Sequence, residues 1–332
     1  MLIMYERMFF VRVYGDIDGV LNQTEFGALC RALFRNEKGK PYPVDTADLI
    51  TLFTIFDTNK DNAINKEEFK FCWQKWIKQV IPPINRLVEE VNFDVVVYSL
   101  DWHPPDHVSF IDNIHIRPLH QSCKISSEDA RVYDVLTFDI QHRKQDQKMW
   151  PRHCVQNTWG SELHKDLKVS EDAVLVKKGT DPDVDSYSAF WDNNKLSYTS
   201  LNEELQKRNI TDVFVCGIAY DVCVGATATH ANEAGYRTIL IEDACRGVSE
   251  EDIRATKEAI KANNGLIIQS SKVKYLVNGK DRPPQLGMKL ALELASKMKK
   301  TTATTTITTT TTTTATINNT ANSSITNATG KI

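Results

Sequence analysis

Two cysteines lie seven positions apart in the stretch VCGIAYDVCV, residues 215–224, where an apolar strand leads into a helix. Cys216 lies inside the predicted strand, and we expect it to be buried and inert, as most protein cysteines are. Cys223 falls in the first turn of the predicted helix, with Asp221 as its N-cap. The free N–H groups and the positive end of the helix dipole lower the pKa of a thiol placed there. Cys223 is therefore the candidate nucleophile.

A second group of residues has the composition of a metal site. In LDWHPPDHVSF, Asp101 and His103 are two positions apart, so their side chains point to the same side of an extended chain. The stretch MWPRHCV adds His153, and His107 is a further candidate, either as a fourth ligand or as a supporting residue. One carboxylate with imidazoles and no thiolate is typical of open catalytic sites for zinc, iron or manganese. An Asp-x-His pair alone is more often a loop hydrogen bond, so this prediction depends on the other motifs.

Alternating apolar runs and helical stretches must position these residues. The runs are typical of strands buried in a parallel sheet, and they cover residues 94–100, 173–178, 212–217, 237–242 and 265–270. Between them lie helical stretches such as SEEDIRATKEAI, which begins with a capping-box pattern at Ser249 and Asp252. The pattern predicts a doubly wound α/β sheet within residues 80–299, with its chemistry at the carboxyl ends of the strands. Lys178 stands at such an end.

One strand is missing from this alternation. Ile84, Leu87, Val88 and Val91 form the apolar stripe of a crossover helix, and a crossover helix should follow a strand. The stripe instead follows a helix of another unit and the pair Pro82-Pro83. We therefore expect a sheet that is one strand short.

Residues 1–79 are interpreted as a pair of calcium-binding helix–loop–helix units. The loop DTNKDNAINKEEF places oxygen ligands at positions 1, 3, 5, 7, 9 and 12, which are Asp57, Asn59, Asp61, the carbonyl of Ala63, Asn65 and Glu68. Asn62 replaces the usual glycine at the bend, which is acceptable because asparagine adopts positive φ more readily than most residues. Ile64 is the apolar residue that pairs neighbouring loops. The upstream loop YGDIDGVLNQTEF has Tyr14 at position 1, so we expect Ca²⁺ in the second loop and a degenerate, structural first loop.

Charge, hydropathy and cysteine content limit the possible binding partners and the cellular compartment of the protein. A formal net charge of −3 with mixed signs gives no reason to expect nucleic acid or a membrane, and no apolar run is long enough to span a bilayer. Seven scattered cysteines fit a reducing compartment, and the charged start MLIMYERMFFVRV is unlike a secretory signal, so we expect a cytoplasmic protein, with the nucleus as the alternative. The Thr-rich tail, residues 300–332, is predicted to be disordered. A homo-oligomer is compatible with the sequence.

Four separated motifs, taken together, resemble one family. The stretches DWHPPDHVSF, WPRHCVQNTWGSELH, KKGTDPDVDSYSAFWDN and AYDVCVGATA, in this order, are similar to nicotinamidases of the isochorismatase-like hydrolase superfamily. The resemblance is to the animal form with an N-terminal EF-hand region, and it covers about residues 1–298. It implies a hydrolase that converts nicotinamide to nicotinate and ammonia.

The resemblance also implies the roles of individual residues. Cys223 is the nucleophile that forms a thioester, and Lys178 helps to hold the thiolate. The backbone N–H groups of Ala219 and Cys223 form the oxyanion hole, and the Ile218–Ala219 bond is the non-proline cis peptide of this family. Trp150 walls the ring pocket. Asp101, His103 and His153 bind a divalent metal, zinc by preference, whose open position takes the pyridine nitrogen.

The chain departs from the family in one segment. Relatives carry a strand and loop of the form LIVDVQNDF before the first crossover helix, and its first aspartate carries protons for the cysteine. No such segment occurs here, and no substitute acid is found in the sequence. The missing strand is central in the family's sheet, so its loss predicts an impaired enzyme. Two alternatives follow: a hydrolase of another amide or a vinyl ether, and an inactive calcium-binding protein that retains the hydrolase scaffold.

Overall fold

A six-stranded parallel sheet forms the centre of the protein in the computed structural model, which describes residues 2–5, 20–23, 50, 53–54, 57, 59–247, 249–288, 291 and 294–295. The strand order is β10-β9-β8-β1-β4-β7. The strands are β1 (Leu2–Tyr5), β4 (Val96–Asp101), β7 (Val174–Lys178), β8 (Asp212–Ile218), β9 (Arg237–Arg246) and β10 (Leu266–Ile268). The five apolar runs of the sequence therefore form strands, as predicted.

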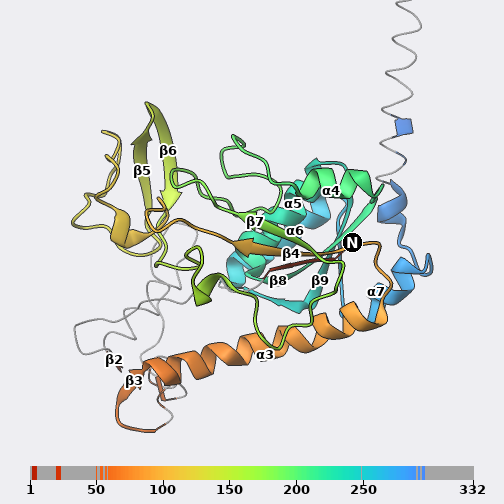
Figure 1. The fold of residues 1–332 in the computed structure, drawn as a ribbon, viewed down its shortest axis with the longest axis horizontal. Helices are drawn as coiled ribbons and strands as arrows, with labels where there is room; N and C mark the ends of the chain where they lie inside the picture. Colours follow the sequence, from red (N-terminus) through yellow and green to blue (C-terminus); the bar gives the residue numbers. More distant parts are fainter. Residues whose placement is uncertain are drawn as a thin grey trace, which may run out of the picture. The chain divides into compact units, whose positions relative to one another are not determined.

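The expectation that the sheet lacks a central strand is wrong. Strand β1, the dark red strand in Figure 1, pairs in parallel with both β4 and β8, with Tyr5 opposite Ser99 and Gly217. The central strand is thus supplied by the first residues of the chain, far from the crossover helix in sequence. The alternation could not reveal it, because the strand has only four residues and residues 6–65 separate it from helix α3 (Lys66–Glu90), which leads into β4. The division between residues 79 and 80 stays a proposal, and the sheet includes residues from both sides of it.

Helices cover both faces of the sheet. Helix α3 (Lys66–Glu90) contacts β9 and α7 (Ser270–Val277), whereas α5 (Gly225–Glu233) contacts β8, β9 and α6 (Glu250–Ala262). Figure 1 shows α3 on one side of the strands and α5 and α6 on the other. The short helix α4 (Leu201–Lys207) precedes β8. The capping prediction is confirmed, because Ser249 Oγ accepts a hydrogen bond from the Asp252 N–H group at the start of α6.

Helix α3 joins two parts of the chain that the sequence treats separately. It begins directly after β3 (Ala63–Asn65), which pairs antiparallel with β2 (Val20–Asn22), and it continues without interruption through Pro82 and Pro83. Leu21 lies opposite Ile64 in this small ladder, as expected for two paired calcium loops. The carboxyl half of α3 buries residues on the sheet, namely Val80, Ile81, Ile84 and Leu87, with Val91 just after the helix. The helix that leads into β4 is therefore also the helix that follows the 57–68 loop.

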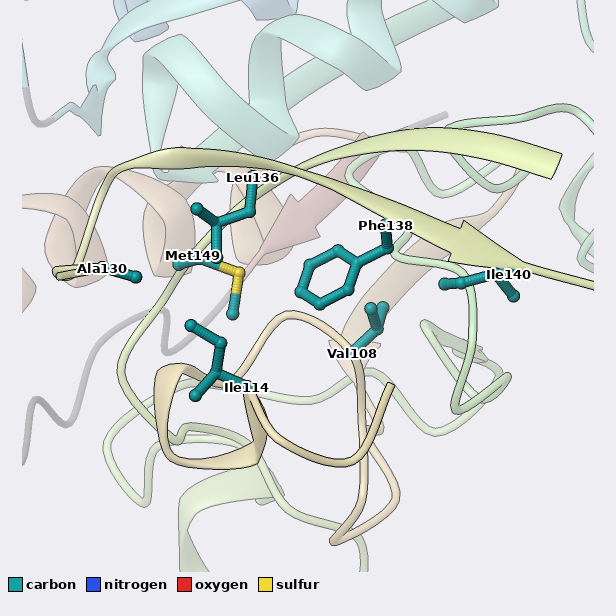
Figure 2. Packing of buried hydrophobic residues seen from close by; sticks show 7 residues of the cluster. All are labelled: Val108, Ile114, Ala130, Leu136, Phe138, Ile140 and Met149. Carbon is teal, nitrogen blue, oxygen red and sulfur yellow. The ribbon is translucent and has the colours of Figure 1, made fainter. Parts of the chain in front are cut away.

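A second, smaller core lies between β4 and β7 in the sequence. The hairpin of β5 (Val135–Ile140) and β6 (Arg143–Lys148) turns at Gln141 and His142, which both have positive φ. Figure 2 shows the side chains under this hairpin, which are those of Val108, Ile114, Ala130, Leu136, Phe138, Ile140 and Met149. This cluster connects the segment after Asp101 with the segment before His153, so it fixes two of the candidate metal-binding stretches against each other.

The described residues include no helix that is long and apolar enough to cross a membrane. Residues Met1–Arg282 form one compact unit, and Pro283–Ile332 form a second. The prediction of disorder for residues 300–332 falls outside the described residues, as do most residues of the first calcium loop.

Candidate active site

Cys223 lies just beyond the carboxyl end of the central strand β8. The chain leaves β8 through a cis peptide bond between Ile218 and Ala219, as the resemblance implied, and enters a π-helical turn over Tyr220–Val224. The Ala219 carbonyl accepts hydrogen bonds from the N–H groups of Val222 (3.2 Å) and Val224 (3.0 Å). The turn leads directly into α5 and leaves Cys223 buried. Cys223 thus stands at a helix start, while Cys216 is buried inside β8, as predicted.

The predicted N-cap at Asp221 is not formed. Ala219 is the cap residue of the π-helical turn, and no side chain caps it. Asp221 instead accepts a hydrogen bond from the N–H group of Ser249 (2.7 Å), which ties the turn to the start of α6. The sequence did not predict a π-helical turn, which begins at Tyr220, one residue before the predicted N-cap.

Lys178 lies at the centre of the site. Its Nζ donates to the Cys223 Sγ (3.4 Å) and to the Ser186 carbonyl (2.6 Å), and it forms an ion pair with the carboxylate of Asp101. All three charged or nucleophilic groups are buried. Strands β4 and β7 are paired in register, with Asp101 opposite Lys178, which is why their side chains meet. A thiol, an ammonium and a carboxylate therefore form one contiguous chain of contacts.

Burial and charge act against each other on these groups. Burial raises the pKa of the Cys223 thiol above its usual range, although the positive charge of Lys178 opposes the increase. Burial would lower the pKa of Lys178, but the Asp101 carboxylate holds it above its ordinary value. Burial would raise the pKa of Asp101, and Lys178 holds it below its ordinary value. At neutral pH the lysine and aspartate are thus an ion pair, and Cys223 is a thiol rather than the pre-formed thiolate that the helix start alone predicts.

Asp101, His103 and His153 converge next to this chain of contacts. Their candidate ligand atoms all lie within 4.8 Å of one another, and the three residues are buried. The Nδ1–H of His103 donates to the Gly179 carbonyl (2.9 Å), and the Nδ1–H of His153 donates to the Pro151 carbonyl (2.7 Å). Each Nε2 therefore keeps a lone pair, which is the arrangement found in metal-binding histidines. Burial, with His103 close by, lowers the pKa of His153 to about 4, so this imidazole is neutral and able to bind a cation.

His107 is also near this cluster, but its hydrogen bonds differ. His103, His107 and Asp185 form a second group whose candidate ligand atoms lie within 4.8 Å of one another. However, Nδ1 of His107 accepts a hydrogen bond from the backbone N–H of Ser109 (3.3 Å) and lies 2.8 Å from the Ser109 hydroxyl. A backbone N–H can only donate, so the ring proton of neutral His107 is on Nε2. This tautomer favours a donor role for His107 over a ligand role.

Two structural features of the site were missed in the sequence. Gly179 has a φ of +62°, and a Cβ built there would lie 2.3 Å from Cε1 of His103, so only glycine fits against this imidazole. Asp185 is buried, with its carboxylate accepting from the Gln147 amide (3.1 Å) and from the Ser186 N–H (2.7 Å). Both residues lie in the KKGTDPDVDSYSAFWDN stretch, where one glycine directly after the strand and three closely spaced aspartates were the available signal.

Trp150 lies on the other side of the same segment. It is buried, and its indole N–H donates to the hydroxyl of Tyr187 (3.2 Å), which follows the residue that binds Lys178. The ring of Tyr133 packs edge-on against Trp150, with centroids 5.4 Å apart. Trp150 is thus bonded to Tyr187, the residue directly after Ser186, whose carbonyl accepts from Lys178.

The second calcium loop has the backbone shape that its sequence predicts. Asn62 has a φ of +65°, which confirms that asparagine takes the place of glycine at the bend. The buried carboxylate of Asp57 accepts from the N–H groups of Asp61 (3.1 Å) and Asn62 (2.9 Å), which directs it into the loop. Asn59 and Asp61 are hydrogen-bonded to each other, and Ala63 donates its N–H to Asp61 (2.9 Å). The side chains of Asn65 and Glu68 lie outside the described residues.

Comparisons with known proteins agree with this arrangement. A family model described as an isochorismatase domain matches residues 69–272, and a model of an EF-hand domain pair matches residues 44–75. The nicotinamidase of Saccharomyces cerevisiae is 34% identical over 198 residues, which is 56% of this chain and 86% of the yeast protein. The nicotinamidase of Escherichia coli is 36% identical over 167 residues, 50% of this chain and 70% of that protein. A crystal structure of the yeast nicotinamidase bound to the inhibitor nicotinaldehyde superposes with a TM-score of 0.51 at 32% identity, over 58% of this chain and 88% of that one.

Proposed function

The chain belongs to the isochorismatase family, and from this premise we propose that it is a nicotinamide amidohydrolase, which converts nicotinamide to nicotinate and ammonia. The observation that carries the proposal is the buried contact of Lys178 with both Cys223 and Asp101, beside the Asp101, His103 and His153 cluster. An amide is a poor electrophile with a poor leaving group, so its hydrolysis needs a nucleophile, a stabiliser of the oxyanion and a proton source. The site offers a candidate for each.

Cys223 supplies the nucleophile. Because its thiol is neutral at rest, it loses a proton only as it attacks the carboxamide carbon, and the Lys178 cation stabilises the negative charge that develops. The N–H groups of Ala219 and Cys223 are the proposed donors to the oxyanion. The displaced proton moves to the amide nitrogen, the C–N bond breaks and ammonia leaves. Water then hydrolyses the thioester, which releases the acid and restores the thiol.

The carboxylate in contact with Lys178 is Asp101, which makes it one candidate for holding the proton between these steps. A second candidate is Glu6, because it directly follows β1, whose carboxyl end lies at the same edge of the sheet as those of β4 and β8. Glu6 is outside the described residues. Because the sheet contains β1, the loss of a central strand is no longer a reason to expect an impaired enzyme, whereas the absence of the aspartate motif still is.

Asp101, His103 and His153 are the proposed ligands of a divalent metal, with zinc as the first choice. They fit such an ion because two Nε2 lone pairs and a carboxylate converge while both Nδ1–H groups are held by carbonyls. When bound, the ion supplies an electrophilic point that holds and orients the pyridine ring. Asp101 would then be shared between the ion and Lys178. Trp150 is the proposed wall of the ring pocket, and His107, whose ring lies against that of His103, is a proposed hydrogen-bond donor.

A calcium ion is proposed for the 57–68 loop. The bend at Asn62 and the inward carboxylate of Asp57 fit the oxygen coordination that Ca²⁺ requires. Asp57, Asn59, Asp61, the carbonyl of Ala63, Asn65 and Glu68 are the proposed ligands.

Ammonia release from nicotinamide tests the proposal, with Cys223→Ala as the inactive control and Cys123→Ala as the matched control at a thiol outside the site. We expect turnover in the native protein and in Cys123→Ala, and none in Cys223→Ala. Turnover of another amide with no action on nicotinamide would support the alternative hydrolase. A folded protein that binds calcium and hydrolyses neither would support the inactive scaffold, and either result would overturn the proposal.

A further inference from the structure

The inward face of the β5–β6 hairpin is apolar on one strand and polar on the other. On β5 it carries Leu136 and Phe138, which pack in the small core of Figure 2. On β6, Gln147 lies directly opposite Leu136 and Gln145 directly opposite Phe138, so the two amides share this face. Both glutamines are buried. A buried amide is unfavourable unless its polar groups find partners, so these side chains need acceptors on the inward side of the hairpin.

The acceptors come from the chain segment that follows β7. The side-chain amide of Gln145 donates to the Asp183 carbonyl (2.8 Å), and that of Gln147 donates to the Asp185 carboxylate (3.1 Å). Alternate residues of β6 are thus bonded to alternate residues of the segment. The Gln147 amide also donates to the Lys148 carbonyl (2.7 Å). Because both of its partners are oxygen acceptors, the nitrogen of this amide must face them.

Asp185 is a buried carboxylate to which uncharged groups donate. It accepts from the Gln147 amide and from the Ser186 N–H (2.7 Å). Its candidate ligand atom lies within 4.8 Å of those of His103 and His107, so it belongs to the candidate active site. A buried carboxylate that loses a donor is poorly solvated, and it then competes for other donors nearby. Gln147 therefore limits how strongly Asp185 attracts the groups around it.

The strongest donor nearby is the ammonium of Lys178. Its Nζ donates to the carbonyl of Ser186 (2.6 Å), the residue directly after Asp185, and to the Sγ of Cys223 (3.4 Å). Burial would lower the pKa of Lys178, whereas Asp101 and, to a smaller extent, Asp185 hold it above its ordinary value. The charge of Asp185 thus already acts on this ammonium. A carboxylate released from its glutamine would compete with the thiol for it.

The start of the same segment has anchors of its own. Arg117 donates from Nε to the Asp183 carboxylate (2.7 Å) and from Nη2 to the Pro182 carbonyl (2.7 Å). The Val108 N–H donates to that carbonyl as well (2.7 Å). Loss of the Gln147 contact should therefore leave this end of the segment in place, and its effect should be confined to the end that reaches Lys178.

We propose that Gln147 is a positioning residue, whose amide holds the Asp185 carboxylate so that the Lys178 ammonium stays directed at Cys223. This inference rests on the proposed function, since it gives Gln147 a part in the activity of that site. Without the amide, Asp185 draws the ammonium toward itself. The negative charge that develops on the attacking sulfur then loses part of its stabilisation.

Alkylation of Cys223 tests the inference without any substrate. The full-length protein, with zinc added, would be treated with iodoacetamide near neutral pH, and mass spectrometry of its peptides would follow each cysteine. Gln147→Met nearly keeps the length of the side chain and removes the donor. We expect it to slow alkylation of Cys223 by about 10-fold, the scale of a small misplacement of a catalytic group. Cys123, which is half-buried and outside the site, is the internal reference and should react at the native rate.

Gln145→Met is the matched control. It removes a buried amide from the same face of β6, but the bond that is lost goes to the Asp183 carbonyl, whose residue Arg117 also holds. We expect urea unfolding to show a similar loss of stability in both variants, with slow alkylation of Cys223 only in Gln147→Met. Equal slowing in the two variants would overturn the inference, and so would native alkylation in Gln147→Met.

A double-mutant cycle tests whether Gln147 acts through Asp185. In an Asp185→Asn background, Gln147→Met should change the alkylation rate by less than about 2-fold, because the competing carboxylate is gone. The full effect in that background would contradict the inference. If Gln147→Met does not fold, Gln147→Asn takes its place in both experiments. Its shorter amide should give a smaller slowing of the same reaction, and native alkylation in that variant would overturn the inference.

Nicotinamide turnover on the same samples separates this inference from the proposed function. In Gln147→Met we expect kcat to fall by about 10-fold with KM within about 2-fold of native, as for an interaction that matters in the transition state. Slow alkylation of Gln147→Met in a protein that does not hydrolyse nicotinamide would contradict the proposed function and leave the inference standing. Nicotinamide turnover with native alkylation in Gln147→Met would do the reverse.

Discussion

The calcium loop draws its candidate ligands from twelve consecutive residues, Asp57 to Glu68, whereas the catalytic edge collects Asp101, His153, Lys178 and Cys223 from four separate stretches of chain. In the loop, local turns and side-chain to backbone hydrogen bonds set the geometry, as those of Asp57 with Asp61 and Asn62 illustrate. At the catalytic edge, strand register does so, since Asp101 meets Lys178 because β4 and β7 pair at these residues. Because one strand pairing sets several of these contacts, a change in strand register should disturb several catalytic groups together.

Removing the charge of Lys178 should have the largest effect on turnover and none on calcium binding by the 57–68 loop. Lys178→Met takes the cation away from Cys223 and Asp101, and we expect kcat to fall by about 10³-fold, the scale of losing a group that stabilises developing negative charge. Lys177→Met is the matched control, because this neighbouring lysine is exposed and lies over the Trp102 ring. Calcium affinity, measured by titration calorimetry, should be unchanged in both variants. Equal turnover in the two variants would contradict the role of Lys178.

His153→Ala should distinguish the two proposed metal sites. We expect zinc affinity to fall by at least about 100-fold, since even the partners that support a ligand are worth about 10- to 100-fold. Calcium binding should persist, because none of the proposed loop ligands belongs to this cluster. His120→Ala is the control, because this half-buried ring is hydrogen-bonded to Ser122 and lies outside the candidate metal cluster. Elemental analysis after dialysis measures both metals, and full retention of zinc in His153→Ala would remove this residue from the site.

Glu6→Gln examines whether β1 brings an acid to the catalytic edge. Loss of a positioned proton carrier costs about 100-fold or more in rate, so we expect kcat to fall by about that factor, with Glu6→Asp close to the native rate. Steady-state ammonia release at saturating nicotinamide is the measurement. Native turnover in Glu6→Gln would leave Asp101, through Lys178, as the carrier.

The smallest effect is expected at the opposite edge of the sheet, at Asp212. Burial would raise the pKa of this carboxyl, but its hydrogen bonds and ion pair with Arg237, together with Arg282, hold it below the ordinary value. A depressed pKa contributes stability above the unfolded pKa of about 3.9, and this contribution is lost as the pH falls toward the folded pKa. Because solvent screens this partly exposed pair, Asp212→Asn should lower the free energy of unfolding by only about 0.5–1 kcal/mol at pH 7, with less difference from the native protein below about pH 4. Urea unfolding at both pH values measures this, with the exposed Asp281→Asn as control.

An unchanged stability of Asp212→Asn at neutral pH would show that this ion pair is neutral in its net effect, as many partly exposed pairs are. Loss of turnover in Asp212→Asn without loss of stability would contradict a purely structural role for this residue. It would mean that the two edges of the sheet are coupled, and the contrast between a structural and a catalytic acid would no longer hold.

Local pattern was enough for most elements of the central sheet and for the backbone shape of the 57–68 loop. Five of the six strands of the central sheet, the cap at Ser249 and the bend at Asn62 were predicted, because each depends on residues within a few positions of one another. The order of the motifs was also enough to identify the family. The hairpin of β5 and β6 was missed. The buried residues of β5 alternate with half-exposed ones, and the turn contains no glycine that would mark it.

The sequence alone determined which residue types could do chemistry here, namely one thiol at a helix start, one lysine at a strand end, and an Asp-x-His pair with a distant histidine. Tertiary structure decided three things that no local pattern contains. It placed Leu2–Tyr5 at the centre of the sheet, it buried Cys223 so that its pKa rises above that of a helix-start thiol, and it fixed the histidine tautomers through Gly179, Pro151 and Ser109. The physical reason is common to all three, since pairing between distant strands, desolvation and hydrogen-bond partners from other segments exist only once the chain has folded.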